Sequence, residues 1–267
     1  MTEPSPPAGA AASPGRGLAR ALRYCYRVPW LLWHLLVPLP LTILALTLTA
    51  GMQVGGERLD HRLIRAWSVG LMRVFGFRVH RTGTPLAGAT LFVANHVSWT
   101  DIVLLHSQRV MGFVAKREIA RWPVVGWMAR RAETIFHERG STESLGGVLD
   151  EMLVRLRSGH SVGVFPEGRT RDGRQVGPFH ARIFLAAVES GAPVQPVALR
   201  YGVQGDAQGR VAFQPGEHFL GNFLRLLGEP ARPAEVRFLA PIVAGDATGR
   251  RGIAELARDR ILEAMAR

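Results

Sequence analysis

Apolar and polar residues alternate in two kinds of block, short apolar runs typical of strands and longer runs with helical spacing. The short runs predict strands at 89–95, 110–115, 133–137, 161–165, 194–200 and 234–240. Between the third and fourth of these, a helical face is formed by Leu145, Val148, Leu149, Met152, Leu153 and Leu156. Ser141 or Thr142 can cap this helix and Gly159 can end it. The alternation predicts an α/β domain with a mixed, partly parallel sheet flanked by helices.

The first 80 residues have a different pattern. Residues 1–17 are rich in Pro, Ala, Gly and Ser, which predicts a disordered tail. Residues 28–50 contain no Asp, Glu, Lys or Arg and reach the roughly twenty residues needed to span a bilayer, although Pro38 and Pro40 interrupt the run. We expect either a kinked span or two helices that dip into one leaflet. A cleaved signal peptide fits less well, because the polar stretch before the run is long.

Arginines flank this apolar run on both sides, at 16, 20, 23 and 27 before it and at 58, 62 and 65 after it. The positive-inside rule therefore gives no orientation, and the pattern favours a segment that enters and leaves on the same face. Residues 59–77 have the spacing of an amphipathic helix, which fits either a membrane interface or a core-facing position. The predicted organisation is a tail at 1–17, a membrane-associated helical region at 18–80 and an α/β domain at 81–267.

The composition limits the classes of function. The chain has 33 basic and 21 acidic residues, a net charge of +12, which favours polyanionic surroundings such as nucleic acid, anionic lipid headgroups or an acidic protein. Cys25 is the only cysteine, so an intrachain disulfide and a cysteine-rich metal site are excluded. No nucleic-acid reader motif accompanies the arginines, and charge alone does not account for the apolar run. We therefore expect no nucleic-acid partner.

A polar motif, Asn-His-Val-Ser-Trp-Thr-Asp at 95–101, follows an apolar run directly. The run predicts a buried strand, and Ser98 followed by Asp101 predicts a helix start, which places His96 in the turn between them. In such a turn the Asp101 carboxylate can accept a hydrogen bond from one imidazole nitrogen and leave the other free as a general base. This chemistry suits acyl transfer to an alcohol. Alternatively, Asp101 is only the acidic residue of a capping box and His96 has no chemical role.

A second motif, Phe-Pro-Glu-Gly-Arg-Thr-Arg at 165–171, follows another predicted strand. Gly168 permits an unusual backbone angle or the close approach of a ligand, and Arg169 and Arg171 can bind phosphate through paired hydrogen bonds. A surface turn with solvated charges is the alternative. Lys116 follows a third predicted strand, where it can reach the same anionic ligand or lie in solvent at a helix start.

Together the motifs resemble the glycerolipid acyltransferases of the bacterial 1-acyl-glycerol-3-phosphate acyltransferase type, over about residues 80–205. Residues 95–101 are similar to the family's His-x4-Asp catalytic motif, and residues 165–168 to its acceptor-binding block. Residues 135–139 and 192–197 match two further blocks more weakly. Four blocks in the family's order make the resemblance specific.

The resemblance implies that His96 is the general base and Asp101 its partner, that Glu167 and Gly168 shape the acceptor site, and that Arg139 binds the acceptor phosphate. The family usually continues after Glu-Gly with Thr-Arg. Here the order is Arg169-Thr170-Arg171, so either arginine can take the place of the usual one, and the headgroup stays open.

The expected function is that of a membrane-bound enzyme that acylates the 2-hydroxyl of lysophosphatidic acid to give phosphatidic acid. Acyl-CoA or an acyl carrier protein would donate the acyl group, and no metal or cofactor is required. Alternatives are acylation of another lyso-lipid, such as lyso-ornithine lipid, or a basic, non-catalytic binding protein. The resemblance implies a place at the inner (cytoplasmic) membrane, with the catalytic domain facing the cytoplasm.

Overall fold

The computed structural model describes residues 14–49, 51–138 and 142–266. Its helices are α1 (Pro14–Leu36), α2 (Pro38–Leu48), α3 (Leu59–Val74), α4 (Thr100–His106), α5 (Pro123–Arg131), α6 (Thr142–Arg157), α7 (Leu185–Ser190), α8 (Gln208–Val211), α9 (Phe219–Leu227) and α10 (Gly249–Ala266), with short 3-10 turns η1 (Arg117–Arg121), η2 (Ala181–Phe184) and η3 (Val203–Gly205). Its strands are β1 (Gln53–Val54), β2 (Glu57–Arg58), β3 (Phe77–Thr82), β4 (Leu91–Ala94), β5 (Gly112–Lys116), β6 (Ile135–His137), β7 (Val162–Val164), β8 (Val194–Tyr201) and β9 (Arg232–Phe238).

One seven-stranded sheet organises the domain, in the order β3-β9-β8-β4-β7-β5-β6. Every neighbouring pair is parallel except β8 and β9, which are antiparallel. Strand β4 lies between β8 and β7 and is buried along its whole length. Since a strand with neighbours on both edges has its backbone hydrogen bonds satisfied, the turn that follows β4 starts from a rigid support.

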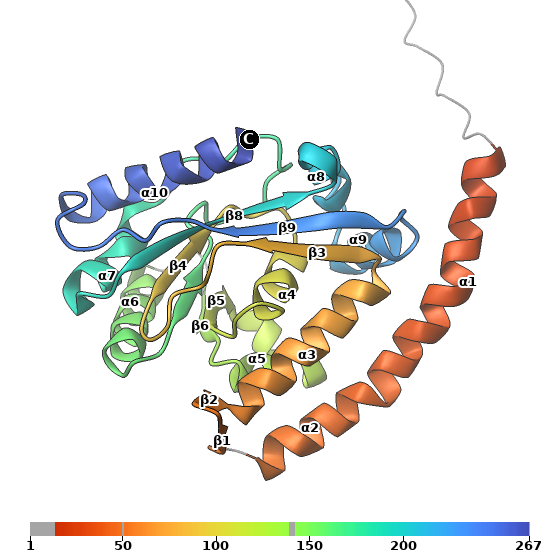
Figure 1. Ribbon diagram of the computed structural model, residues 1–267, viewed down its shortest axis with the longest axis horizontal. Helices are drawn as coiled ribbons and strands as arrows, with labels where there is room; N and C mark the ends of the chain where they lie inside the picture. Colours follow the sequence, from red (N-terminus) through yellow and green to blue (C-terminus); the bar gives the residue numbers. More distant parts are fainter. Residues whose placement is uncertain (1–13, 50, 139–141, 267) are drawn as a thin grey trace, which may run out of the picture.

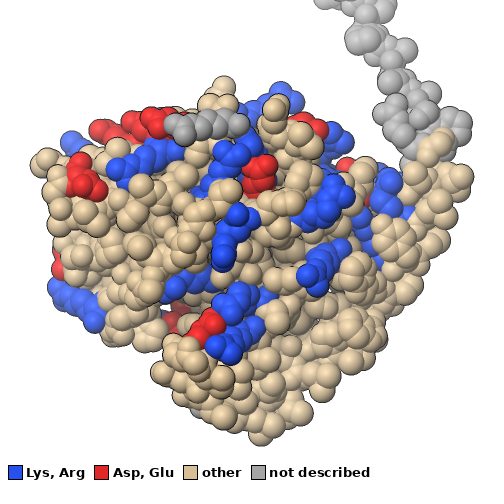
Figure 2. Space-filling view, viewed as in Figure 1, with Lys and Arg blue, Asp and Glu red and all other residues tan. Residues whose placement is uncertain are grey.

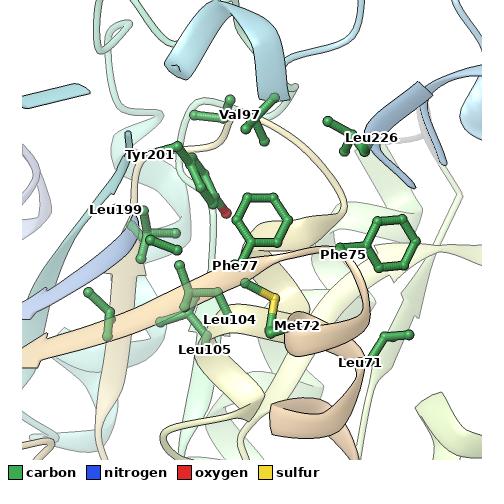
Figure 3. Packing of buried hydrophobic residues seen from close by; sticks show 14 of the residues in the cluster. Leu71, Met72, Phe75, Phe77, Val97, Leu104, Leu105, Leu199, Tyr201 and Leu226 are labelled. Carbon is green, nitrogen blue, oxygen red and sulfur yellow. The ribbon is translucent and has the colours of Figure 1, made fainter. Parts of the chain in front are cut away.

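Helices cover both faces of the sheet, and alternate residues of each strand reach each layer. Phe92 and Ala94 of β4 join the core under α3 and α4, whereas Leu91 and Val93 join the core under α6, α7 and α10. Figure 1 shows the two helical layers with the sheet between them. Figure 3 shows part of the first core, where side chains of α3, α4 and β8 meet around Phe77.

Helices α1 and α2 form an arc along the outside of the molecule, beyond α3, with a break at Val37 (Figure 1). Among the described residues one segment, Gly17–Leu48, is long and apolar enough to cross a membrane, judged by length and composition alone. Arg27 ties α1 to the domain, because its buried guanidinium donates to the carbonyls of Leu227 at 3.0 Å and Glu229 at 2.6 Å. Leu227 is the last residue of α9, where carbonyls lack helical partners, so Arg27 satisfies one of them and complements the helix dipole.

The predicted fold class is confirmed, and all six predicted strands are present within about three residues of their expected bounds. Strand β3 is the main omission. We expected residues 59–77 to form one helix, but α3 ends at Val74 and the chain enters an edge strand at Phe77. We expected a disordered tail at 1–17. Residues 1–13 lie outside the described residues, and residues 14–17 belong to helix α1.

Helix α3 faces the core with Ile64, Leu71, Met72 and Val74, so its core-facing interpretation is confirmed. The two-stranded β1–β2 hairpin just before it was also not predicted, because each of its strands has only two residues.

Candidate active site

Residues whose side chains could bind a ligand or take part in a reaction lie at the carboxyl ends of four strands that are parallel to one another. His96 follows β4, Phe165 follows β7, Lys116 ends β5 and His137 ends β6. Because the carboxyl ends of parallel strands meet at one edge of a sheet, side chains from distant parts of the chain surround a common space there. This cavity has a volume of about 580 Å³, and its walls are His96, Val114, Ala115, Lys116, His137, Val148, Val164, Phe165, Pro166, Gly168, His180, Arg182 and Ile183.

His96 and Asp101 form a hydrogen-bonded pair, as the motif predicts. The imidazole Nδ1 lies 2.8 Å from Asp101 Oδ2, and the backbone N–H groups of Val97 and Ser98 donate to the same oxygen at 2.6 and 2.9 Å. Asp101 is fully buried, whereas 15% of the His96 side chain is exposed. A carboxylate only accepts, so Nδ1 carries the proton toward Asp101 and Nε2 is free to accept one.

Asp101 therefore combines the two roles that the sequence suggested, partner of the His96 imidazole and acidic residue of a capping box. It reaches back to the N–H of Ser98 at the start of α4, as the acid of a capping box does, and it also holds the imidazole. The Ser98 hydroxyl makes no cap. It lies 3.3 Å from the side-chain oxygen of buried Asn222, which also accepts a hydrogen bond from Trp99 Nε1 at 3.0 Å.

Glu167 holds the His96 turn against the second motif. Its Oε1 accepts from the backbone N–H of His96 at 2.9 Å, and its Oε2 accepts from the N–H of Gly177 at 2.8 Å. The backbone N–H of Arg171 donates to the carbonyl of His96 at 2.9 Å, so each segment anchors the other. The imidazole itself stacks on the Phe165 ring, with centroids 3.9 Å apart and 12° between the planes.

Cationic and titratable side chains share the cavity with His96. Lys116, His137, His180 and Arg182 all line it, and no Asp or Glu is among its described lining residues. Gly168 has a φ of 70°, and a Cβ there would lie 3.2 Å from the His180 ring. A residue with a side chain would therefore be strained and crowded at this position, which accounts for the glycine of the motif.

A second cavity of about 320 Å³ lies between α1, α3, α5 and α9, and shares Ala115 with the first. Phe113 lines the second cavity and Phe165 the first, and their rings stack with centroids 5.5 Å apart. The walls of the second cavity are almost entirely apolar. His106 is an exception, but burial lowers its pKa to about 4, so its side chain is neutral near pH 7.

The structure places the predicted site residues in three ways. Lys116 and Gly168 line the cavity with His96, and Glu167 lies buried behind it, where it shapes the turn. Arg171 does not line the cavity, because its guanidinium is held against Glu167, with Nε 3.2 Å from Oε2. Arg169 is exposed and also outside the cavity wall.

Arg139 lies outside the described residues, so its predicted contact with phosphate stays a prediction. No group of three or more His, Cys, Asp or Glu that could hold a metal ion occurs within the described part of the chain.

Four residues near the dyad were missed, and one of them is His137, which ends β6 and lines the cavity. His180 and Arg182 come from the short segment around the 3-10 turn η2 before α7, which carries no periodic signal in the sequence. Tyr201, which donates a hydrogen bond to Asp101 at 2.6 Å, had a usable signal. It follows the predicted strand 194–200 at its carboxyl end, the side on which the site forms.

Comparison with known proteins agrees with this geometry. Residues 76–200 match the family model "Acyltransferase". The chain is 36% identical to a lyso-ornithine lipid O-acyltransferase of Pseudomonas aeruginosa over 69% of this chain and 71% of that one. It is 35% identical to a 1-acyl-sn-glycerol-3-phosphate acyltransferase of Neisseria gonorrhoeae over 57% and 60%.

The fold is also that of a solved acyltransferase. The crystal structure of the 1-acyl-sn-glycerophosphate (LPA) acyltransferase PlsC from Thermotoga maritima superposes with a TM-score of 0.72 at 20% identity, covering 94% of this chain and 98% of that one. The chain belongs to the acyltransferase family whose members include lysophosphatidic acid and lyso-ornithine lipid acyltransferases.

Proposed function

We propose that this acyltransferase esterifies the 2-hydroxyl of lysophosphatidic acid, with His96 as the general base and Asp101 as its partner. The observation that carries the proposal is the cavity in which the paired imidazole shares one space with Lys116 and Arg182. A phosphate monoester carries between one and two negative charges near neutral pH, and an ammonium with a guanidinium is suited to bind it.

The charge of the cavity favours a purely anionic headgroup. Ornithine carries an ammonium as well as a carboxylate, and a site for it should offer an acidic side chain. The described lining has none, since Glu167 is turned away from the cavity toward the backbone of His96 and Gly177. Lysophosphatidic acid has no ammonium that would need such a partner.

The proposed reaction has no covalent enzyme intermediate. His96 Nε2 takes the proton from the acceptor hydroxyl as the oxygen attacks the thioester carbonyl, and Asp101 stabilises the imidazolium that forms. The C–S bond then breaks, the ester forms, and the leaving thiolate takes from His96 the proton that came from the acceptor hydroxyl. The donor is an acyl thioester, carried by coenzyme A or by an acyl carrier protein, and no metal or cofactor enters any step.

The apolar cavity is the proposed site for an acyl chain. It adjoins the His96 cavity at Ala115, and its walls offer an acyl chain dispersion contacts and shelter from water. An acyl chain with its carbonyl near His96 would therefore extend past Ala115 into the space that Phe113 and Trp122 help to line.

The N-terminal helices are the proposed attachment to a membrane. Their outer surface carries exposed apolar side chains, namely Leu18, Leu22, Trp30, Leu32, Trp33, Leu36, Leu41, Leu44 and Leu48. In Figure 2 the surface along α2 and the adjoining part of α1 is free of charged side chains, while arginines lie over the domain beside it. We place the enzyme at the inner (cytoplasmic) membrane, with the domain on the cytoplasmic side, where both lyso-lipid and soluble donor are accessible.

Lyso-ornithine lipid is the second candidate acceptor. Two observations favour it: the 36% identity to the Pseudomonas aeruginosa enzyme, and the Arg169-Thr170 order in place of the family's usual Thr-Arg. Both acceptors present a hydroxyl and an anionic group, so the same dyad would serve either reaction.

The test is transfer of a labelled acyl group from acyl-CoA and from acyl carrier protein, with both acceptors present at equal concentration. Wild type is compared with His96→Ala and with His80→Ala, a matched control that removes an exposed imidazole from β3. We expect phosphatidic acid from wild type and His80→Ala and none from His96→Ala. If acylated ornithine lipid is the sole product, lysophosphatidic acid is rejected as the acceptor. If pure His96→Ala is active, His96 is rejected as the general base.

A further inference from the structure

Asp101 has a second oxygen, whose partner comes from a distant part of the chain. Oδ1 accepts a hydrogen bond from Tyr201 Oη at 2.6 Å. Tyr201 is the last residue of β8 and is completely buried, and among the described residues it is the only hydrogen-bond partner of Oδ1. The two oxygens of one carboxylate are thus divided, with Oδ2 for the imidazole and the turn and Oδ1 for the phenol.

The Asp101 carboxylate can only accept this hydrogen bond, and a third group supports the same direction. The Thr100 hydroxyl donates to Tyr201 Oη at 3.1 Å, so the phenol proton is directed toward Asp101. Burial, with the nearby charge of Asp101, raises the pKa of Tyr201 well above its ordinary value. The phenol therefore keeps its proton over the whole range in which an acyltransferase would be assayed, and stays a donor.

The Tyr201 ring is packed tightly in the core. It lies against the Phe77 ring, with centroids 5.5 Å apart, and Figure 3 shows it among Val97, Leu199 and Phe77. A carboxylate turns easily about its terminal bond, because sp³–sp² torsions have broad minima. A donor on a rigid ring can restrict that rotation, whereas a water molecule or a mobile side chain could not.

We infer that Tyr201 is a positioning residue for the His96–Asp101 pair, whose hydroxyl holds Asp101 Oδ1 so that Oδ2 stays directed at the imidazole. The inference rests on the proposed roles of His96 and Asp101. Tyr201 touches no substrate, because it lies outside the cavity wall and acts only through Asp101. Without the phenol, a buried carboxylate oxygen would lose its partner and the carboxylate could rotate away from His96.

Tyr201→Phe tests the inference, because it removes one oxygen and keeps the ring. We expect kcat to fall about tenfold, since hydrogen bonds to charged groups are the stronger ones, while KM for donor and acceptor changes less than about twofold. We also expect the acid limb of the kcat/KM profile to move about half a pH unit upward, because charge that the phenol withdrew returns to Oδ2 and stabilises the imidazolium. A packing role alone would move neither the profile nor kcat at constant KM.

The other charged or titratable groups around the dyad are unchanged by this substitution; they are Glu167 and Arg171 behind the turn, and Lys116, His137, His180 and Arg182 across the cavity. Tyr26→Phe is the matched control, since it removes an equivalent oxygen from an exposed residue of α1. Its kcat, KM and pH profile should equal those of wild type.

A second variant covers a failure to fold. Thr100→Val removes the donor that orients the phenol proton while keeping the side-chain volume, and should lower kcat about threefold. Unchanged kcat and profile in a folded Tyr201→Phe would overturn the inference, as would unchanged kcat in Thr100→Val if Tyr201→Phe does not fold. An inactive wild type or an active His96→Ala would instead overturn the proposed function.

Discussion

Replacing Asp101 by Asn tests the charge of the buried carboxylate at nearly constant shape. Only one of the two terminal atoms can still accept a hydrogen bond. Three donors converge on Oδ2, from His96, Val97 and Ser98, so the amide oxygen should take that side. The amide NH2 then faces Tyr201, so the phenol loses its carboxylate acceptor and the hydrogen bond to a charged group is lost. We expect the free energy of unfolding to fall by about 1–2 kcal/mol.

The larger effect should be on the rate. With Nδ1 and Oδ2 2.8 Å apart in the wild type, the centres of charge of imidazolium and carboxylate lie about 4 Å apart. At an effective dielectric constant of about 20, this pair is worth about 4 kcal/mol. Each 1.36 kcal/mol corresponds to a tenfold change in rate, so the neutral amide should lower kcat about a thousandfold. KM should stay within about threefold, because Asp101 does not line the cavity.

The assay is initial-rate transfer of a labelled acyl group to lysophosphatidic acid at varied acceptor concentration, with circular dichroism and thermal unfolding on the same preparations. A folded Asp101→Asn with kcat within about tenfold of wild type would refute the argument that the carboxylate charge stabilises the imidazolium. Equal losses in kcat and in acceptor affinity would instead show that the substitution had distorted the cavity.

Two further predictions concern binding and acid stability. Arg182→Ala should raise KM for lysophosphatidic acid about tenfold and leave KM for the donor unchanged, because Arg182 lines the cavity, whereas Arg251→Ala, at an exposed residue, should change neither. Steady-state kinetics with each substrate varied in turn measures both constants. An unchanged KM for lysophosphatidic acid in Arg182→Ala would contradict the proposed contact with phosphate. A hydrogen bond from Arg225 lowers the pKa of Glu217 to about 2 in the folded protein, below its ordinary 4.5. Its stabilisation is therefore present above pH 4.5 and is lost as the pH falls toward 2, so Glu217→Gln should destabilise less at about pH 3 than at about pH 6. Denaturant unfolding at the two pH values measures this, and equal losses would contradict it.

The dyad could be predicted because its geometry is local. Both residues lie in one turn, five positions apart, and the turn itself supplies two of the donors to the carboxylate. The second motif was recognised for its glycine and arginines, but its main contribution in the structure is made by the buried carboxylate of Glu167. Residue type suggested that Arg171 would bind substrate, whereas its actual partner is Glu167, four residues earlier.

Strand β3 shows where pattern analysis failed. Residues 77–82 lie on the edge of the sheet, where one side of the strand has no neighbour and only Phe77 is buried. A half-exposed edge strand has a weak apolar signal, and the helical spacing of the residues before it extended the predicted helix over its start. Pairing with β9, which lies some 155 residues later in the chain, determines its structure.

By itself the sequence determined what depends on local periodicity and composition: the apolar runs that become strands, the apolar run at 28–50 without Asp, Glu, Lys or Arg, the excess of arginine and the turn that joins His96 to Asp101. Tertiary structure alone decided which distant residues meet at that turn. The parallel pairing of β4 with β7 and β8 brings Phe165 and Tyr201 to the dyad, and the path of the chain before α7 turns Arg182 into the cavity. These contacts join residues up to 100 positions apart, and they follow from strand order and packing, which no local pattern encodes.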